Sequence, residues 1–118
     1  MSGRKLSVEF PSINAQSMAS NITGSQSVIN LYDNVVYHFI WSGANPIGSI
    51  VIQLSLDGIN WQNYQNSPGT DFVVSPGGSA GTYMVVIKLT PAIYIRPAYT
   101  TSGGSVGTLT ALFAAKMV

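Results

Sequence analysis

Apolar and polar residues alternate with a period of two along most of this chain. In residues 49–55 the alternation places Ile50, Ile52 and Leu54 on one face and mainly polar residues on the other. A period of two puts successive side chains on opposite faces of a β-strand, whereas a helix needs a repeat near 3.6. No segment has convincing helical periodicity, so the sequence predicts an all-β protein. Comparable runs occupy residues 4–10, 28–32, 35–41, 70–74, 82–89, 92–100 and 106–117.

Turn signals separate these runs at intervals of about 8–12 residues. The clearest is Asp57-Gly58, because Asp and Gly readily adopt the backbone angles of a tight hairpin turn. A returning strand then carries Trp61 and Tyr64. About eight or nine short strands at this spacing predict an antiparallel β-sandwich, of which the jelly roll is one form. The 118 residues are enough for one domain and too few for two, so the sandwich is expected to span residues 1–118.

Two of the expected strands have patterns that suggest their place in a sheet. In residues 35–41 both alternating faces are apolar, which predicts a central strand that is buried on both sides. Residues 92–100 contain Pro97. Proline has no amide hydrogen to donate, so this strand is expected at a sheet edge or at a bulge.

The N-terminal region departs from this regular pattern. Residues 12–27 are rich in Ser and Asn and are expected to form a long loop with one weak strand near residues 15–20. Residues 2–10 are a candidate arm toward a neighbouring molecule, and the whole arm region spans residues 1–27. No secretory signal is visible, and no apolar run reaches the ~18 residues of a membrane span. Neither export nor membrane insertion is therefore expected.

The scarcity of charge restricts the classes of partner. Charged residues make up 8% of the chain, whereas an average globular protein has about 25%. The net charge is +1, and a nucleic-acid binder would need clustered Lys and Arg to neutralise phosphates. So small a charge gives weak repulsion between copies, which favours a protein whose surfaces contact other proteins. The absence of cysteine excludes a disulfide scaffold and thiolate zinc sites.

Titratable residues are too few for a recognisable catalytic site. Asp33 and Asp57 lie in turn signals, where an aspartate typically sets the turn geometry. His38 is the only histidine and is expected to pack within the sheet, because a metal site needs further ligands. No acidic cluster suits calcium, and neither Gly-Gly pair has the sequence of a phosphate loop. We therefore expect no enzyme activity, no metal and no cofactor.

Three residues are candidates for contacts with a glycan or a protein partner. Trp61 and Tyr64 follow the turn at residues 57–58 and, if exposed, would form a platform for a sugar ring. The alternative, which we favour, is that Trp61 packs over a sheet edge and holds the hairpin. Arg96 is placed to stack on Tyr94 or Trp61, or to reach a carboxylate across an interface.

Three segments carry a resemblance to a known group of proteins. Residues 48–61 (GSIVIQLSLDGINW) contain a strand, an Asp-Gly turn and a Trp, and they are followed by residues 95–103 (IRPAYTTSG) and 107–111 (GTLTA). This order resembles small β-sandwich structural proteins of tailed bacteriophages, including capsid decoration (cementing) proteins and tail-associated proteins. The resemblance covers residues 35–118.

The resemblance implies a non-enzymatic late protein located in the virion. Such a protein would form a homo-oligomer and bind the major capsid protein or other virion proteins, with no direct contact to nucleic acid or membrane. Our first hypothesis is therefore a decoration protein that cements a phage capsid. The alternatives are a tail or baseplate-associated structural protein and a carbohydrate-binding module that uses Trp61 and Tyr64. A small hydrolase ranks far below them.

Overall fold

In the computed structural model, which describes residues 6–29, 34–88 and 92–117, every regular element is a β-strand. The all-β prediction is therefore confirmed. The long strands are β1 (Leu6–Ser17), β4 (Asn34–Asn45), β5 (Gly48–Ser55), β10 (Gly81–Lys88), β11 (Tyr94–Thr101) and β12 (Val106–Met117). The short strands are β2 (Ile22–Thr23), β3 (Ser27–Val28), β6 (Gln62–Asn63), β7 (Gln65–Ser67), β8 (Thr70–Asp71) and β9 (Val73–Val74).

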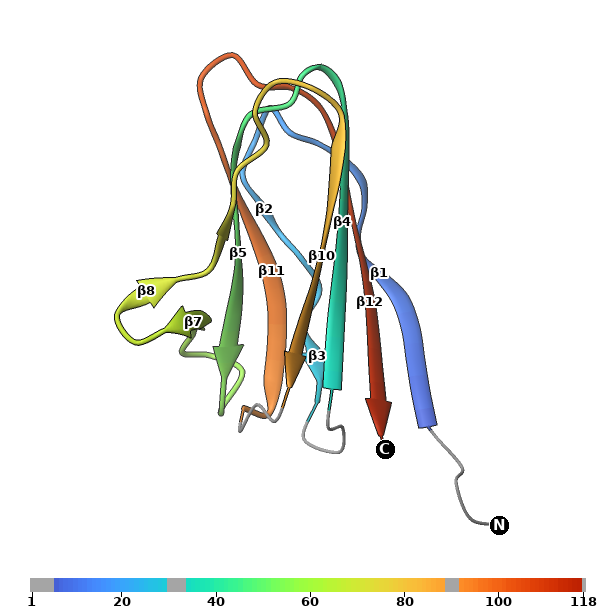
Figure 1. Ribbon diagram of the computed structural model, residues 1–118, viewed down its shortest axis with the longest axis vertical. Helices are drawn as coiled ribbons and strands as arrows, with labels where there is room; N and C mark the ends of the chain where they lie inside the picture. Colours follow the sequence, from blue (N-terminus) through green and yellow to red (C-terminus); the bar gives the residue numbers. More distant parts are fainter. Residues whose placement is uncertain (1–5, 30–33, 89–91, 118) are drawn as a thin grey trace.

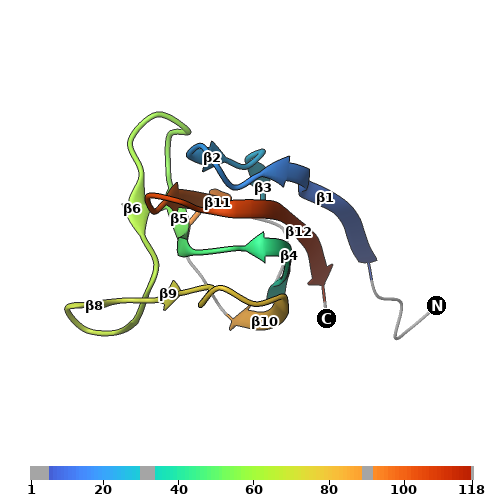
Figure 2. The ribbon, with the colours of Figure 1, turned by 90° about the horizontal axis from the view of Figure 1, so that it is seen from above.

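The long strands form two antiparallel sheets that pack face to face (Figures 1 and 2). The first, called the β4 sheet, has the order β1-β12-β4-β10. The second, called the β5 sheet, has the order β2-β11-β5-β6, with β3 also paired to β11 and β9 also paired to β5. Strands β7 and β8 form a separate hairpin at the side of the sandwich (Figure 1). The antiparallel β-sandwich is confirmed. Strand β12 has the predicted bounds, whereas β1 and β4 each have 12 residues and are longer than expected.

The core lies between the two sheets and is built from the inward-facing half of each strand. The Tyr37 and Phe39 rings stack along β4 with their centroids 5.7 Å apart. Full burial of one large apolar side chain stabilises a fold by about 1.5–3 kcal/mol, so this layer provides the main stabilising interaction. Other fully buried residues are Ile13, Ile87 and Leu109 from the β4 sheet and Ile50, Ile52, Ile95 and Tyr99 from the β5 sheet.

Strand β4 is central in its sheet, as expected, but it is buried on one face only. Val35, Tyr37 and Phe39 point into the core and are buried. Val36 and Ile40 alternate with them on the outer face and are only half-buried. The prediction of burial on both sides is wrong because the second sheet packs against the inner face alone.

The expectation of an edge position for residues 92–100 is also wrong. Strand β11 lies inside its sheet, between β5 on one side and the short strands β2 and β3 on the other. Pro97 is paired with Ile52 of β5, and on its other side it faces the gap between β2 and β3. Because no continuous partner strand lies there, the missing amide hydrogen of Pro97 costs no ladder hydrogen bond.

The N-terminal region differs from the predicted loop and arm. Strand β1 pairs antiparallel with β12 from Leu6 to Ser17, and residues 22–28 supply β2 and β3. Residues 6–28 are thus part of the sandwich, and residues 1–5 of the expected arm lie outside the described residues. The register of β1 shifts twice after Pro11, and Ala15 has a φ of +49°. These irregularities break the period of two beyond Pro11, so the strand expected at residues 4–10 is confirmed for residues 6–10, while its continuation to Ser17 was not predicted.

A buried hydroxyl connects three segments at one end of the sandwich. The Tyr99 side chain is fully buried, and its hydroxyl lies within hydrogen-bonding distance of the Met18 and Ile47 carbonyls and of the Ser105 hydroxyl. A Cβ atom at Gly48 would lie 2.6 Å from the Tyr99 ring, and Gly48 has a φ of +136°. Glycine is therefore required beside this ring.

We expect Tyr99→Phe to destabilise the protein by about 1–3 kcal/mol, because it removes the buried hydroxyl that donates to the Ile47 or Met18 carbonyl, and of these two only the Met18 carbonyl has Thr101 Oγ1 as a second donor. Tyr37→Phe is the matched control, since the Tyr37 hydroxyl is buried with no more than a weak interaction with the Ser12 hydroxyl, and it should cost clearly less. Equilibrium unfolding in urea measures both free energies. Equal losses for the two variants would contradict the role assigned to the Tyr99 hydroxyl.

Candidate functional site

The outer face of the β5 sheet carries a chain of polar contacts that begins at Arg96. Arg96 on β11 is paired with Gln53 on β5, and its Nε donates a hydrogen bond of 2.8 Å to the Gln53 Oε1. The Gln53 amide donates to Asn63 Oδ1 at 3.3 Å, and the Asn63 amide donates to Asp71 Oδ2 at 2.9 Å. The Arg96 guanidinium lies 4.0 Å from the centre of the Trp61 ring. Tyr94 and Trp61 were the two stacking partners expected for Arg96, and in the structure Arg96 stacks on Trp61.

Trp61 and Tyr64 lie in different environments, although they are close in sequence. Trp61 is half-buried under Arg96. Tyr64 packs against the hydrophobic core, and its ring centroid is 6.0 Å from that of Phe72. A sugar platform would require two exposed rings that share a surface. The structure instead gives Trp61 a contact with Arg96 and Tyr64 a contact with the core.

The loop after β5 is organised around the Asp57 carboxylate. Its Oδ1 accepts hydrogen bonds from the Ile59 and Asn60 amides, each at 2.8 Å, and its Oδ2 accepts one of 2.7 Å from the Asn60 side chain. The Ser55 hydroxyl donates to Oδ1 as well, at 3.0 Å. Hydrogen bonds from Asn60 and Ile59 hold the pKa of the Asp57 carboxyl well below its usual range. Asp57 therefore sets the turn geometry.

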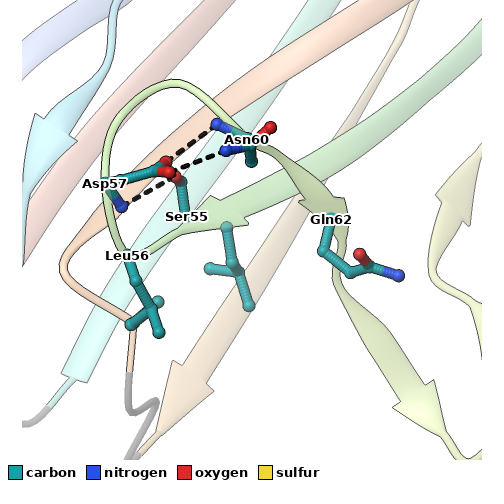
Figure 3. A pocket seen from close by; sticks show the side chains of 7 residues that line it. Ser55, Leu56, Asp57, Asn60 and Gln62 are labelled. Atoms are coloured by element: carbon teal, nitrogen blue, oxygen red, sulfur yellow. Dashed lines mark hydrogen bonds between the residues drawn. The ribbon is translucent and has the colours of Figure 1, made fainter.

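A depression of about 570 Å³ lies beside this loop (Figure 3). Leu54, Leu56 and Ala92 supply its apolar lining, and Ser55, Asp57, Asn60 and Gln62 complete it. Leu56 is 68% exposed and Ile59, in the same loop, is 80% exposed. The Asp57 hydrogen bonds hold the loop that forms one wall of the depression. Sequence reasoning missed it, although apolar residues on both sides of Asp57-Gly58 were the available signal.

A second candidate surface, called the apolar face, covers the outer side of the β4 sheet. The strand register aligns Met84, His38, Leu112 and Pro11 in one row across all four strands. The neighbouring row contains Val86, Val36 and Ala114, and Ile40 lies on the same face of β4. A shallow depression of about 360 Å³ lies between the rows.

Several side chains of the apolar face are exposed in the isolated chain. Met84 is 60% exposed, Val86 is 52% exposed and Leu112 is 41% exposed. His38 is half-buried on this outer face, not packed inside the sheet as expected. The same register pairs Glu9 of β1 with Ala114, so the second row ends in a charged residue, whereas the row of Met84, His38, Leu112 and Pro11 contains no Asp, Glu, Lys or Arg. Contiguous exposed apolar residues of this kind mark contact sites for other proteins.

The part of the chain that the structure describes holds no group of three or more His, Asp or Glu residues that could bind a metal ion. Within the same ranges, no helix is long and apolar enough to cross a membrane. The candidate binding surfaces are the outer faces of the two sheets. The outer face of the β5 sheet is polar, with Arg96 lying over Trp61, and the outer face of the β4 sheet is the apolar face.

No protein-family model and no curated protein matches this chain in sequence. Among solved structures, the SPBc2 prophage-derived protein YomS is similar with a TM-score of 0.64 and 11% identity, over 98% of this chain and 97% of that chain. The structure of the infectious bursal disease virus Gx strain is similar with a TM-score of 0.58 and 14% identity, over 98% of this chain and 32% of that chain. The VP2 subviral particle of that virus gives a TM-score of 0.57 and 10% identity, over 98% and 33% of the two chains.

These likenesses show the fold alone. They place the chain among β-sandwiches of a type that also occurs in a prophage-derived protein and in virus particles. The chain spans about a third of the matched viral chains, so those proteins contain much that is absent here.

We expect Asp57→Asn to lower the melting temperature at neutral pH, because an amide replaces the carboxylate that accepts four hydrogen bonds. The folded-state pKa of Asp57 is lowered from 3.8, so its stabilisation is present above that value and is lost as the pH falls toward the folded-state pKa. The difference between wild type and variant should therefore shrink below about pH 4. Thermal unfolding from pH 7 to pH 2 measures it, and a constant difference would contradict the assignment.

Proposed function

We propose that this chain is a structural protein of a phage virion, which binds the capsid shell as a decoration protein. The observation that carries the proposal is the apolar face, an uncharged row of exposed side chains across the four strands of one sheet. The similarity of the fold to a prophage-derived protein and to virus particle structures supports the viral context. The location would then be the virion.

The physical reason is the low cost of covering this face. Removing apolar surface from water stabilises a contact by about 25 cal/mol per Å². Charged side chains would have to be desolvated on binding, and the row of Met84, His38, Leu112 and Pro11 includes none, so little of that gain is lost along this row. A specific contact typically buries about 1,600 Å² in total, which a four-stranded sheet face and a flat partner surface can supply.

The opposite face of the molecule supports an orientation on the shell. The outer side of the β5 sheet presents Arg96, Gln53 and Asn63, which are hydrogen-bonded to one another in a chain. Polar groups of this kind are stable in contact with water. In the proposed arrangement the β4 sheet faces the shell and the β5 sheet faces solvent.

The strand order agrees with the form of sandwich expected for such a protein. With β2 and β3 counted as one strand position and β6 and β9 as another, each sheet has four positions. The chain changes sheets at β1 to β2, β3 to β4, β4 to β5, β9 to β10, β10 to β11 and β11 to β12. We interpret this double Greek-key order as a jelly roll.

Two alternatives remain as predictions. A tail or baseplate-associated protein would use the same apolar face against a different partner. A carbohydrate-binding module would have to depend on Trp61, because Tyr64 packs against the core. One face of the Trp61 ring is covered by Arg96, which leaves less ring surface for a sugar than the sequence suggested.

The test is binding of the purified chain to phage particles that lack it. Leu112 is 41% exposed at the centre of the apolar face, so Leu112→Glu should leave the fold intact and weaken particle binding at least ~tenfold, by placing a carboxylate in an apolar contact. Val73→Glu introduces the same charge at a residue that is 46% exposed on the β5 sheet, and it should bind normally. Equal binding by both variants would refute the proposal. Recovery of the bound protein with tails and not with heads would favour the tail alternative.

A further inference from the structure

The two sheets have four outer edges, and three of them are irregular. At the β1 edge, the strand contains Pro11, two register shifts and Ala15 with a φ of +49°. On the β5 sheet, one edge is divided into β2 and β3 and the other into β6 and β9, each only 2 residues long. Proline, bulges and short strands are the usual means by which proteins prevent a sheet edge from pairing with another chain.

The fourth edge, strand β10, has none of these features. Its eight residues pair with β4 in one unbroken register from Gly81 to Lys88. Residues 81–87 contain neither proline nor a charged residue. At about 3.4 Å per residue, this edge is about 27 Å long. Alternate backbone N–H and C=O groups of an edge strand point away from the sheet and are available for pairing.

The side chains on both sides of this edge are apolar. Met84 and Val86 are exposed on the outer side, where they belong to the apolar face. On the inner side the Tyr83 ring packs against Phe72 with centroids 5.9 Å apart. This contact closes the corner of the sandwich, while the described strands give β10 only β4 as a pairing partner. A long, regular and apolar edge is a pairing site when nothing protects it.

We propose that β10 pairs antiparallel with β10 of a second copy of this chain, about a two-fold axis perpendicular to the sheet. An antiparallel edge is self-complementary under such an axis, so the same strand serves both partners. Residues 81–87 of this edge are uncharged, and the partner strand must be uncharged where it faces them to avoid burying an unpaired charge. A second copy meets this condition because its β10 has the same uncharged residues 81–87. A net charge of +1 on each copy gives only weak repulsion between them.

This pairing also extends the surface described above. A two-fold axis perpendicular to the sheet keeps the outer sides of both β4 sheets on the same side. With the axis near Val85, Met84 of each copy would lie opposite Val86 of the other, and the two apolar faces would become one continuous surface. A dimer would therefore present twice the apolar area to the shell. The role of this surface rests on the proposed function, which the inference deepens, whereas the pairing of β10 does not depend on it.

The experiment measures association and edge protection in the purified protein alone. Sedimentation equilibrium should show a dimer, and Val86→Lys should weaken it at least ~tenfold by placing a charge at the paired edge. Val106→Lys is the matched control: Val106 is 55% exposed, Val86 is 52% exposed, and only Val86 lies on β10. Hydrogen exchange of the unmodified protein should show amides of residues 81–87 that become more protected as the concentration rises, with no change in residues 6–17.

Three outcomes overturn the inference. A monomer at every concentration excludes pairing between copies. An oligomer that survives Val86→Lys, without protection of β10, uses a different surface. Protection of β10 that requires added shell protein assigns the edge to that protein. If Val86→Lys does not fold, the exchange measurement alone decides. A dimer that never binds particles would refute the proposed function and leave the pairing, whereas a monomer that binds them would do the reverse.

Discussion

Burial of apolar side chains between two sheets holds this protein together, and the β4 sheet receives that burial on one face only. A pleated strand directs alternate residues to opposite faces. Tyr37 and Phe39 are therefore covered by the β5 sheet, while Val36 and Ile40 are turned away from it. Because β4 and β12 are apolar on both faces, the outer one lacks a covering layer in the isolated chain. The proposed contacts with a shell and with a second copy both supply that layer.

The sequence was most informative where the period of two is unbroken. It located β4, β5, β10 and β12 and predicted the sandwich, since nothing in these segments competes with the strand pattern. It located only the start of β1 and missed its continuation beyond residue 10, where the register shifts around Ile13 hide a buried residue within a polar segment. It also failed at Pro97, because residue types do not show that the neighbouring edge is interrupted. These features depend on which strands meet, and a single sequence does not contain that information.

The candidate surfaces were predicted less completely than the fold. The contact between Trp61 and Arg96 was among the expected ones, because a guanidinium commonly stacks on an indole ring. The packing of Tyr64 against the core was not expected, since Tyr64 lies between the short strands β6 and β7, where no alternation of residues indicates which way its ring points. The apolar face was visible in the sequence as a strand with two apolar sides, but it was interpreted as burial within the chain. The scarcity of charge was the better guide, because it indicated surfaces that meet other proteins.

The most direct test of the account is the reactivity of two methionines in free and particle-bound protein. Met84 is 60% exposed on the apolar face and Met18 is fully buried in the core. Peroxide oxidises exposed methionines faster than buried ones, so Met84 should react first in the free protein. On the particle, the account predicts that Met84 becomes nearly as slow to oxidise as Met18. If Met84 reacts equally fast in both states, the apolar face stays uncovered and the central claim is contradicted.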